Sequence, residues 1–426
     1  MGQTGGGAPR IHYAWVIAGL TFLVLLATAG VRATPGVMMV VWGEEFGWSR
    51  TAISGAIAIN IALFGLIGPF AAAVIDRAGL RRVVSAALAL LACAVAESTQ
   101  MSSQWQLVLF WGVLVGTGSG VTSMVLAAVV TNRWFEERRG LVLGALSAAN
   151  ATGQMIFLPS LANIVTTSGW RPAAMWVAGV AGCLSVLVLL FLRDKPEDMG
   201  LVRYGWTPAA AQDQTKRKPP LEALAWAARR REFWLLAGSF FVCGASTNGL
   251  IGTHLIPACH DYGIPEVRAA GLLALMGIFD ILGTTASGWL TDRFSSRRLL
   301  FCYYALRGLS LLFLPQTLQQ GGPALTWFAF FYGLDWVATV PPTVRLTTEV
   351  FGRENTGTVY GWIGAAHQLG ASVAALGAGT IRTEMGDYSL AFWTSGAICF
   401  ATAFLFVAWR TTARTHQTAP QPSPVR

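Results

Sequence analysis

The sequence predicts an all-α integral membrane protein whose twelve transmembrane helices form two pseudo-symmetric six-helix bundles. Apolar residues make up 54% of the 426 residues and charged residues only 12%, whereas a typical soluble domain has about 25% charged residues. Apolar runs of roughly twenty residues recur along the chain, and each is long enough to cross a hydrocarbon core of about 30 Å as a helix. Sequence features also recur at a nearly constant offset, which indicates a duplicated unit.

Twelve apolar runs account for the predicted helices. The first six lie at roughly 14–40, 51–74, 82–100, 105–131, 140–164 and 171–192, and the second six at roughly 233–258, 268–290, 299–318, 323–348, 357–380 and 389–410. Several runs contain proline, including the adjacent Pro341 and Pro342. We expect kinks there, because neighbouring helices in a membrane bundle can supply partners for the freed backbone groups.

The distribution of basic residues supports this helix count and predicts a cytoplasmic amino terminus. With that orientation, only four of the 30 lysines and arginines fall in outer loops, namely Arg50, Arg171, Arg268 and Arg382. Three more fall within predicted helices, namely Arg32, Arg307 and Arg345. Because cytoplasmic loops carry an excess of basic residues, a missed or additional helix would invert the later loops and remove this asymmetry. We therefore expect both termini in the cytoplasm.

The predicted domains follow from these runs. Residues 1–192 form the amino-terminal six-helix bundle and residues 233–410 the carboxy-terminal one. The polar stretch 193–232 between them has the composition of a cytoplasmic linker with one amphipathic helix on the membrane surface. Simple tethering is favoured over a regulatory role for it. Residues 411–426 are rich in Pro, Thr and Gln, which predicts a disordered cytoplasmic tail.

Several other classes of protein are disfavoured by composition and motifs. The net charge of +9 comes in short clusters between apolar runs, which is typical of membrane orientation rather than nucleic-acid binding. The six cysteines show no CxxC and no Cys/His metal spacing. With five histidines and no GxxxxGK[ST] loop, neither an ATP-driven pump nor a membrane enzyme is indicated. A receptor or scaffold would need a folded soluble domain. We expect no cofactor and no metal.

An internal repeat is the strongest architectural signal. Loop AAAVIDRAGLRRV (71–83) and loop SGWLTDRFSSRRL (287–299) share an Asp-Arg pair followed by two arginines, at an offset of 216. RWFEERRG ending at Gly140 matches VFGRENTG ending at Gly357, at an offset of 217. The pairs Gly144/Gly361, Asn150/His367 and Gly153/Gly370 follow at the same offset. A constant offset over two loops and a helix indicates duplication of a six-helix unit.

These two loops resemble the signature loop of the major facilitator superfamily, and the resemblance covers roughly residues 12–410. HYAWVI near the start and EEFGWSR (44–50) resemble the bacterial branch near monocarboxylate and oxalate/formate carriers. This resemblance implies a multi-pass protein of the bacterial inner membrane, and we expect a monomer. Two features of those carriers are absent. Asp280 is followed one turn later by Thr284 rather than arginine, and the eleventh helix carries His367 and Gln368 rather than a basic residue.

The repeated loops contain the candidate cytoplasmic gate. A carboxylate at a helix end, facing arginines and a neighbouring helix terminus, can hold the two bundles in one state. Orientation of the loops by the arginines alone is the simpler alternative. The candidate residues are Asp76, Arg77, Arg81, Arg82, Asp292, Arg293, Arg297, Arg298 and Arg345.

Polar residues at membrane depth are the candidate substrate-binding residues, because ionisable groups there cost about 2.5–3.5 kcal/mol and need a partner. Arg32 in the first helix could hold a carboxylate with two parallel hydrogen bonds, or extend to the outer surface. The repeat places Asn248 opposite Arg32 and His367 opposite Asn150. A histidine can also simply satisfy a hydrogen bond in the core. The substrate-binding candidates are Arg32, Asn150, Gln154, Asn248, His254, His367 and Gln368.

Asp280, Asp335 and Arg307 are candidates for proton coupling or a buried ion pair. Counting from the cytoplasmic loops, Arg307 reaches a depth comparable to that of Asp280 and Asp335. We expect Arg307 to neutralise one or both acids. An acid left unpaired at that depth would carry a proton more readily.

The sequence therefore predicts a secondary active transporter of a small organic anion, most simply a monocarboxylate, coupled to protons and working by alternating access. Its partners would be a small-molecule substrate, protons and the lipid bilayer, and not nucleic acid. The alternative is proton-driven efflux of drugs or other amphiphilic compounds. Efflux predicts a large aromatic pocket with an exposed acid and no essential arginine. The choice of substrate, and uptake versus efflux, are not encoded in a motif.

Overall fold

The computed structural model describes residues 12–206 and 219–408. The predicted tail at 411–426 and the centre of the predicted linker lie outside the described residues. Within these residues the chain folds into twelve helical spans, three of them interrupted, and the predicted all-α membrane fold is confirmed. Nine of the described spans are long and apolar enough by themselves to cross a membrane.

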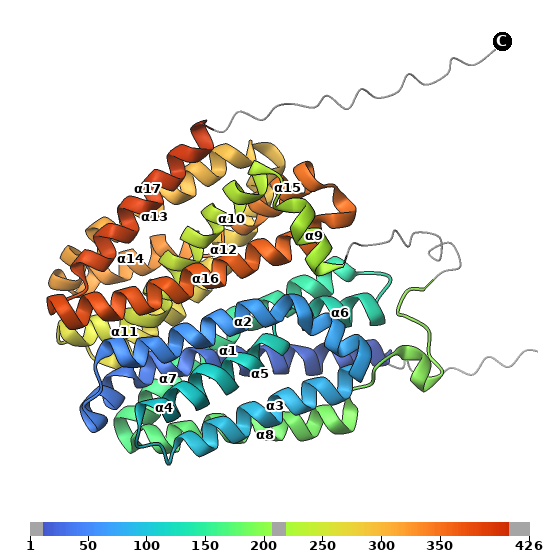
Figure 1. Ribbon diagram of the computed structural model, residues 1–426, viewed down its shortest axis with the longest axis horizontal. Coiled ribbons are helices and arrows are strands. Elements are labelled where there is room, and N and C mark those ends of the chain that lie inside the picture. Colours follow the sequence, from blue (N-terminus) through green and yellow to red (C-terminus); the bar gives the residue numbers. More distant parts are fainter. Residues whose placement is uncertain (1–11, 207–218, 409–426) are drawn as a thin grey trace, which may run out of the picture.

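The first six spans form one half of the molecule. They are α1 (Tyr13–Phe46), α2 (Arg50–Ala78), α3 (Leu80–Ser98), the interrupted span α4 (Gln104–Leu107), η1 (Val108–Leu114), α5 (Val115–Val121) and α6 (Met124–Trp134), then α7 (Arg139–Ser168) and α8 (Trp170–Phe191). Figure 1 shows them as the lower, blue-to-green part of the molecule. A short 3₁₀ turn, η2 (Pro196–Met199), follows.

The second six spans form the other half. They are the interrupted span α10 (Arg231–Gly244), η4 (Ala245–Ile251) and α11 (Gly252–Asp261), then α12 (Glu266–Arg293), α13 (Ser296–Gln320), the interrupted span α14 (Gly322–Asp335) and α15 (Val340–Phe351), α16 (Arg353–Met385) and α17 (Ser389–Ala408). The short helix α9 (Pro220–Ala227) precedes them and contacts this half, because Trp362 Nε1 donates to Pro220 O at 2.8 Å.

The duplication is visible in how helices cross. A Cβ at Gly153 of α7 would lie 2.3 Å from Leu26 O of α1, and a Cβ at its repeat mate Gly370 of α16 would lie 2.0 Å from Phe241 O of α10. The fifth span therefore crosses the first in the same way that the eleventh crosses the seventh. Small residues at such crossings let the backbones approach closely, which is typical of membrane helices.

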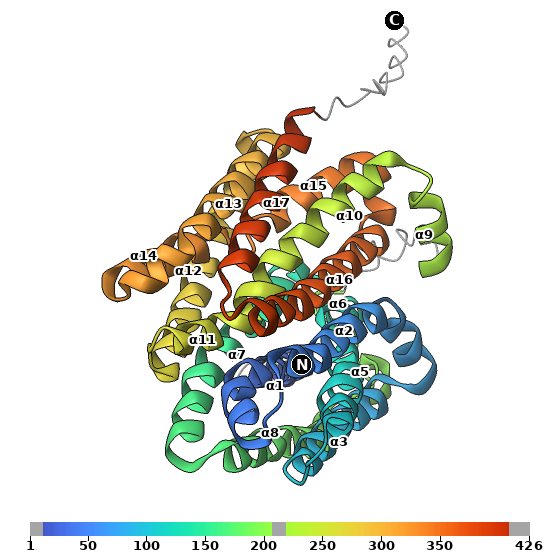
Figure 2. The ribbon, with the colours of Figure 1, turned by 60° about the vertical axis from the view of Figure 1, so that its left-hand side comes forward.

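The halves meet along α2 and α16, α7 and α12, and α1 and α11. Figure 2 shows α2 beside α16 between the two bundles. At the end where α1 ends and α2 begins, called the closed end below, Thr51 Oγ1 donates to Thr383 Oγ1 at 2.9 Å. Deeper in the molecule, Ser372 Oγ donates to Ala58 O at 2.7 Å. The two bundles are thus hydrogen-bonded to each other across this surface.

Candidate functional site

Arg32 lies on α1 at membrane depth and is only partly shielded from solvent. Its guanidinium carbon lies 3.8 Å from the centre of the Phe64 ring of α2, within the range of a cation–π contact. The ion pairs of the described residues do not include Arg32. Within that part of the chain this cation has an aromatic partner and no acidic one, so its charge is available to an anion.

One candidate of the eleventh span, Gln368, lies close to this position. A Cβ at Gly65, the neighbour of Phe64, would lie 2.4 Å from Gln368 Cβ, which places Gln368 against α2. The Gln368 Oε1 atom is buried and has no hydrogen-bond partner among the described residues. His367, the residue before it, packs instead on Phe240 of α10 in the second half, with their ring centres 4.9 Å apart. Arg32, Phe64 and Gln368 are therefore brought to one region where the two halves meet.

The other polar candidates lie on the π-helical segment of the seventh span and on α7. Asn248 is half-buried within the π-helix η4, where its carbonyl accepts a 2.8 Å hydrogen bond from Thr253 Oγ1. π-helical turns inside α-helices are frequent at functional sites. Asn150 is exposed and Gln154 half-buried on α7, the helix that packs on both α1 and α12. The predicted pairing of Asn248 with Arg32 stays a prediction.

His254 is buried, and its hydrogen-bond partners belong to the second half. Its side chain is fully buried, with Nδ1 3.2 Å from Tyr388 Oη and Nε2 2.8 Å from Ala375 O. Both ring nitrogens therefore have internal partners on α16 and at the start of α17. This is the environment of a histidine that satisfies hydrogen bonds in the core.

Arg307 is fully buried and forms its ion pair with Asp335, not with Asp280. Arg307 Nε lies 2.7 Å from Asp335 Oδ2. The Asp280 carboxylate is buried as well, but its Oδ1 accepts hydrogen bonds from Thr284 Oγ1 at 2.9 Å and from Val337 N at 3.0 Å. One acid is thus neutralised by a cation, and the other is held by neutral donors.

Cys243 and Thr339 complete this polar cluster and were not among the predicted site residues. Arg307 Nη1 donates to the Cys243 sulfur at 3.0 Å, and the same sulfur lies 3.3 Å from Thr339 Oγ1. Phe64, which stacks on Arg32, was missed in the same way. A cysteine or phenylalanine within an apolar run gives no signal of its own, because its role here depends on which face of the helix it occupies.

In the first repeated loop, Asp76 forms an ion pair with Arg133 of α6 rather than with the arginines of its own loop. The backbone N–H of Arg81 donates to Asp194 Oδ1 at 2.7 Å, and Arg81 Nε donates to Leu189 O at 2.6 Å. Arg77 and Arg82 are exposed. The loop is therefore tied to the ends of α6 and α8 within its own half.

The second repeated loop is held differently. Arg345 Nη1 donates to Thr291 O, and Arg345 Nε pairs with Glu349 Oε1 at 3.1 Å. The repeat explains the asymmetry, because the position equivalent to Arg133 is Val350. Asp292, Arg293 and Arg298 are exposed, and Arg297 is half-buried.

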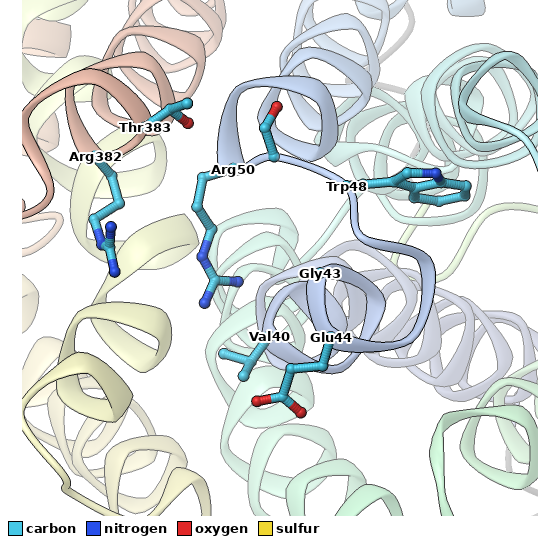
Figure 3. Close-up of a pocket in the computed structure, with 8 residues that line it drawn as sticks. Val40, Gly43, Glu44, Trp48, Arg50, Arg382 and Thr383 are labelled. Carbon is cyan, nitrogen blue, oxygen red and sulfur yellow. The ribbon is translucent and has the colours of Figure 1, made fainter.

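A cavity of about 350 Å³ lies at the closed end, between residues of the two halves. Figure 3 shows Arg50 of α2 and Arg382 of α16 pointing into the same space, with Glu44 of α1 on the other side. Arg382 Nε is held by Asp261 Oδ2 at 2.6 Å. Arg50 Nη1 is buried without a hydrogen-bond partner among the described residues. Two arginines and a glutamate thus line one cavity where the two bundles meet.

Comparison with known proteins agrees with this architecture. The sequence model described as the Major Facilitator Superfamily matches residues 20–375 and again 260–425. The Bacillus subtilis protein described as "Uncharacterized MFS-type transporter YcxA" is 24% identical, over 90% of this chain and 91% of its own. Monocarboxylate transporter 13 of Rattus norvegicus is 26% identical over 92% of this chain and 88% of its own. Monocarboxylate transporter 11 of Homo sapiens is 26% identical over 94% and 84%.

Among solved structures, the chain resembles a bacterial homolog of the human lysosomal transporter Spinster, described as inward-facing and unoccupied. The TM-score is 0.71 at 16% sequence identity, and the match covers 94% of this chain and 96% of the other. At that identity the likeness shows the fold alone.

Proposed function

Because the chain belongs to the Major Facilitator Superfamily, and is therefore a multi-pass membrane transporter and not an enzyme, we propose that it carries a small monocarboxylate together with a proton. Arg32 carries this proposal. An ionisable group at membrane depth normally has a partner, and among the described residues Arg32 has the Phe64 ring but no acid. The partner that completes the site is a substrate carboxylate.

A carboxylate fits Arg32 for geometric reasons. The planar guanidinium offers parallel N–H donors that match the two oxygens of one carboxylate, and it stacks on aromatic faces. Phe64 occupies one face of the group, which leaves its N–H edge for the ligand. The second polar contact, from the other half, would come from the N–H groups of the Gln368 amide, since its oxygen, like those of the carboxylate, can only accept. The names of two relatives, both monocarboxylate transporters, support the same substrate class.

Asp280 is the proposed proton carrier. Asp335 is paired with Arg307 at 2.7 Å, so protonating it would leave a buried cation without its partner. Asp280 has no such cation within ion-pair distance among the described residues, and its donors are a hydroxyl and a backbone amide. Of the two buried carboxylates, Asp280 can therefore gain and lose a proton at the lower cost in free energy.

Alternating access follows from the two-bundle architecture, with the substrate bound where the halves meet. The closed end is the proposed periplasmic side, since the opposite end carries the repeated loops and most of the basic residues. Both termini are then cytoplasmic, in the bacterial inner membrane, and the functional unit is a monomer. The closed end is shut in this conformation by the Thr51–Thr383 bonds.

The test is uptake of a panel of labelled carboxylates by proteoliposomes, with and without an imposed proton gradient. Loss of a hydrogen bond to a charged group costs about 1.5–3 kcal/mol, so Arg32→Gln should lower kcat/KM roughly ten- to hundredfold. Arg32→Lys keeps the charge and should retain part of the activity. Arg268→Gln is the matched control, because Arg268 is exposed at the start of α12.

Two outcomes would count against the proposal. If the parent protein transports neutral or cationic compounds but no organic anion, the proposed substrate class is wrong. Efflux of amphiphiles then becomes the better explanation. If Arg32→Gln transports carboxylates at the parent rate, the assignment of Arg32 is wrong although the fold and the substrate class stand.

A further inference from the structure

The tenth span is interrupted between α14 and α15, and the interruption frees backbone groups at membrane depth. The first helix ends at Asp335, the second begins at Val340, and the next two residues are Pro341 and Pro342. Prolines have no N–H, so the usual hydrogen bonds to the carbonyls of the preceding turn cannot form. In lipid these groups must find partners within the protein.

The carbonyl groups at the end of α14 are bound by Arg307 of α13. Arg307 Nη2 donates to Asp335 O at 2.5 Å and to Trp336 O at 3.2 Å. The last carbonyls of a helix carry partial negative charge, which a cation stabilises. The same guanidinium that neutralises the Asp335 side chain thus also holds the end of the helix.

The remaining groups of the break are bound mainly by α12. Asp280 Oδ1 accepts the N–H of Val337 at 3.0 Å, and Ser287 Oγ donates to Ala338 O at 2.6 Å. Val337 O accepts the N–H of Val340 at 2.9 Å and closes a turn. Side chains from the two neighbouring helices therefore bind both sides of the interruption.

We infer that this break is a hinge of the transport cycle, and that Arg307, Asp280 and Ser287 are positioning residues that set the direction of α15 relative to α14. This rests on the proposed function for its link to the proton. A carboxylate acceptor makes a hydrogen bond roughly twice as strong as a neutral one. A proton arriving at Asp280 weakens its bond to Val337 N–H and frees α15 to move.

The movement of α15 reaches the repeated loop of the second half. Arg345 lies on α15 and donates to Thr291 O at the end of α12. The charged and titratable groups around Asp280 are Arg307 of α13, Asp335 of α14 and Cys243 of α10. Helix α7, on another side of α12, has no titratable side chain after Arg139. A proton on Asp280 would therefore change the contacts of the repeated loop, which lies at the end of the molecule away from the closed end.

The first test is amide hydrogen exchange of the purified full-length protein, followed in peptides that cover residues 336–340. Ser287→Ala and Asp280→Asn should each speed exchange there about tenfold, since each loosens a bond that closes the break. Thr285→Ala is the matched control on the same helix, because its hydroxyl bonds to Ile281 O of its own turn. Unchanged exchange in both variants would overturn the inference. No substrate is needed, so failure here is separate from failure of the proposed function.

The second test restores the missing N–H groups with the double variant Pro341→Ala/Pro342→Ala. A hinge role predicts slower exchange at the break and a maximum transport rate at least about fivefold lower, with little change in KM. A break that serves only packing predicts the same slowing of exchange with transport unchanged. Slower exchange with unchanged transport would overturn the inference.

Discussion

The paired glycines of the repeat allow a sharp test of the crossing geometry. A Cβ at Gly370 would lie 2.0 Å from Phe241 O, and one at Gly153 would lie 2.3 Å from Leu26 O. Ordinary contacts between heavy atoms need about 3.5 Å, so Gly370→Ala must separate α16 from α10 by roughly 1.5 Å. Overpacking of this kind costs about 1–3 kcal/mol, and more where backbone rather than a side chain must move.

The matched controls are another glycine pair of the repeat, Gly144 on α7 and Gly361 on α16. At neither position would an added Cβ have a heavy atom within 4 Å apart from its chain neighbours and the backbone of its own helix. Alanine there should leave stability unchanged or raise it by up to about 1 kcal/mol, since alanine favours helix over glycine. All four residues lie in the two helices that occupy equivalent positions in the halves, so each test variant has a control on its own helix.

The assay is the midpoint of thermal unfolding in detergent, read by fluorescence-detected size-exclusion chromatography at a fixed heating time. Gly153→Ala and Gly370→Ala should lower the midpoint by several °C, and the two controls should not. If Gly370→Ala is as stable as Gly361→Ala, the close crossing of α10 and α16 is wrong. The same result at Gly153 and Gly144 would refute the crossing of α1 and α7.

Two further variants test the ion pairs by the same assay. Asp335→Ala leaves the buried Arg307 uncompensated and should cost about 3–5 kcal/mol; an unfolding midpoint equal to that of the parent would contradict a buried pair. Asp76→Ala removes a pair whose acid side chain is 68% exposed, so the expected loss is below about 1 kcal/mol. A large loss of stability at Asp76 would instead mean that the loop is essential to the fold.

The fold could be predicted from the sequence because the membrane dictates both the length and the composition of each span. The proline pair Pro341–Pro342 predicted an irregularity in the tenth span, and the structure places a break directly before it. The π-helical segment η4 could not be predicted, because it continues the helix on either side and differs from it only in hydrogen-bond register. The interruption of the fourth span at Thr122–Ser123 gave no proline signal either.

The site could be predicted only in part, because sequence position gives the depth of a residue but not its direction around the helix. Counting depth correctly identified Arg307 as the partner of an acid, yet it could not choose between Asp280 and Asp335. The choice follows from the direction of α14 and the position of its last turn. For the same reason His254 was a substrate candidate by depth, although it is buried and its hydrogen-bond partners belong to the second half.

The repeated loops show that neighbours along the chain need not be partners in space. The arginines nearest to Asp76 in sequence were expected around it, but the ion pair comes from Arg133 on a different helix. A signal was present in the repeat, since Arg133 is basic where its counterpart Val350 is apolar. A residue that breaks the symmetry of a duplication was the better pointer to a specific partner.

The most direct measurement is proton movement driven by substrate alone. Liposomes holding the protein and a trapped pH-sensitive dye receive a poorly membrane-permeant monocarboxylate outside, with protein-free liposomes as the control. Proton-coupled carboxylate transport predicts internal acidification by the parent, its loss in Asp280→Asn, and retained exchange of labelled for unlabelled substrate in that variant. Carboxylate uptake by the parent with no acidification, or acidification that survives Asp280→Asn, would contradict it.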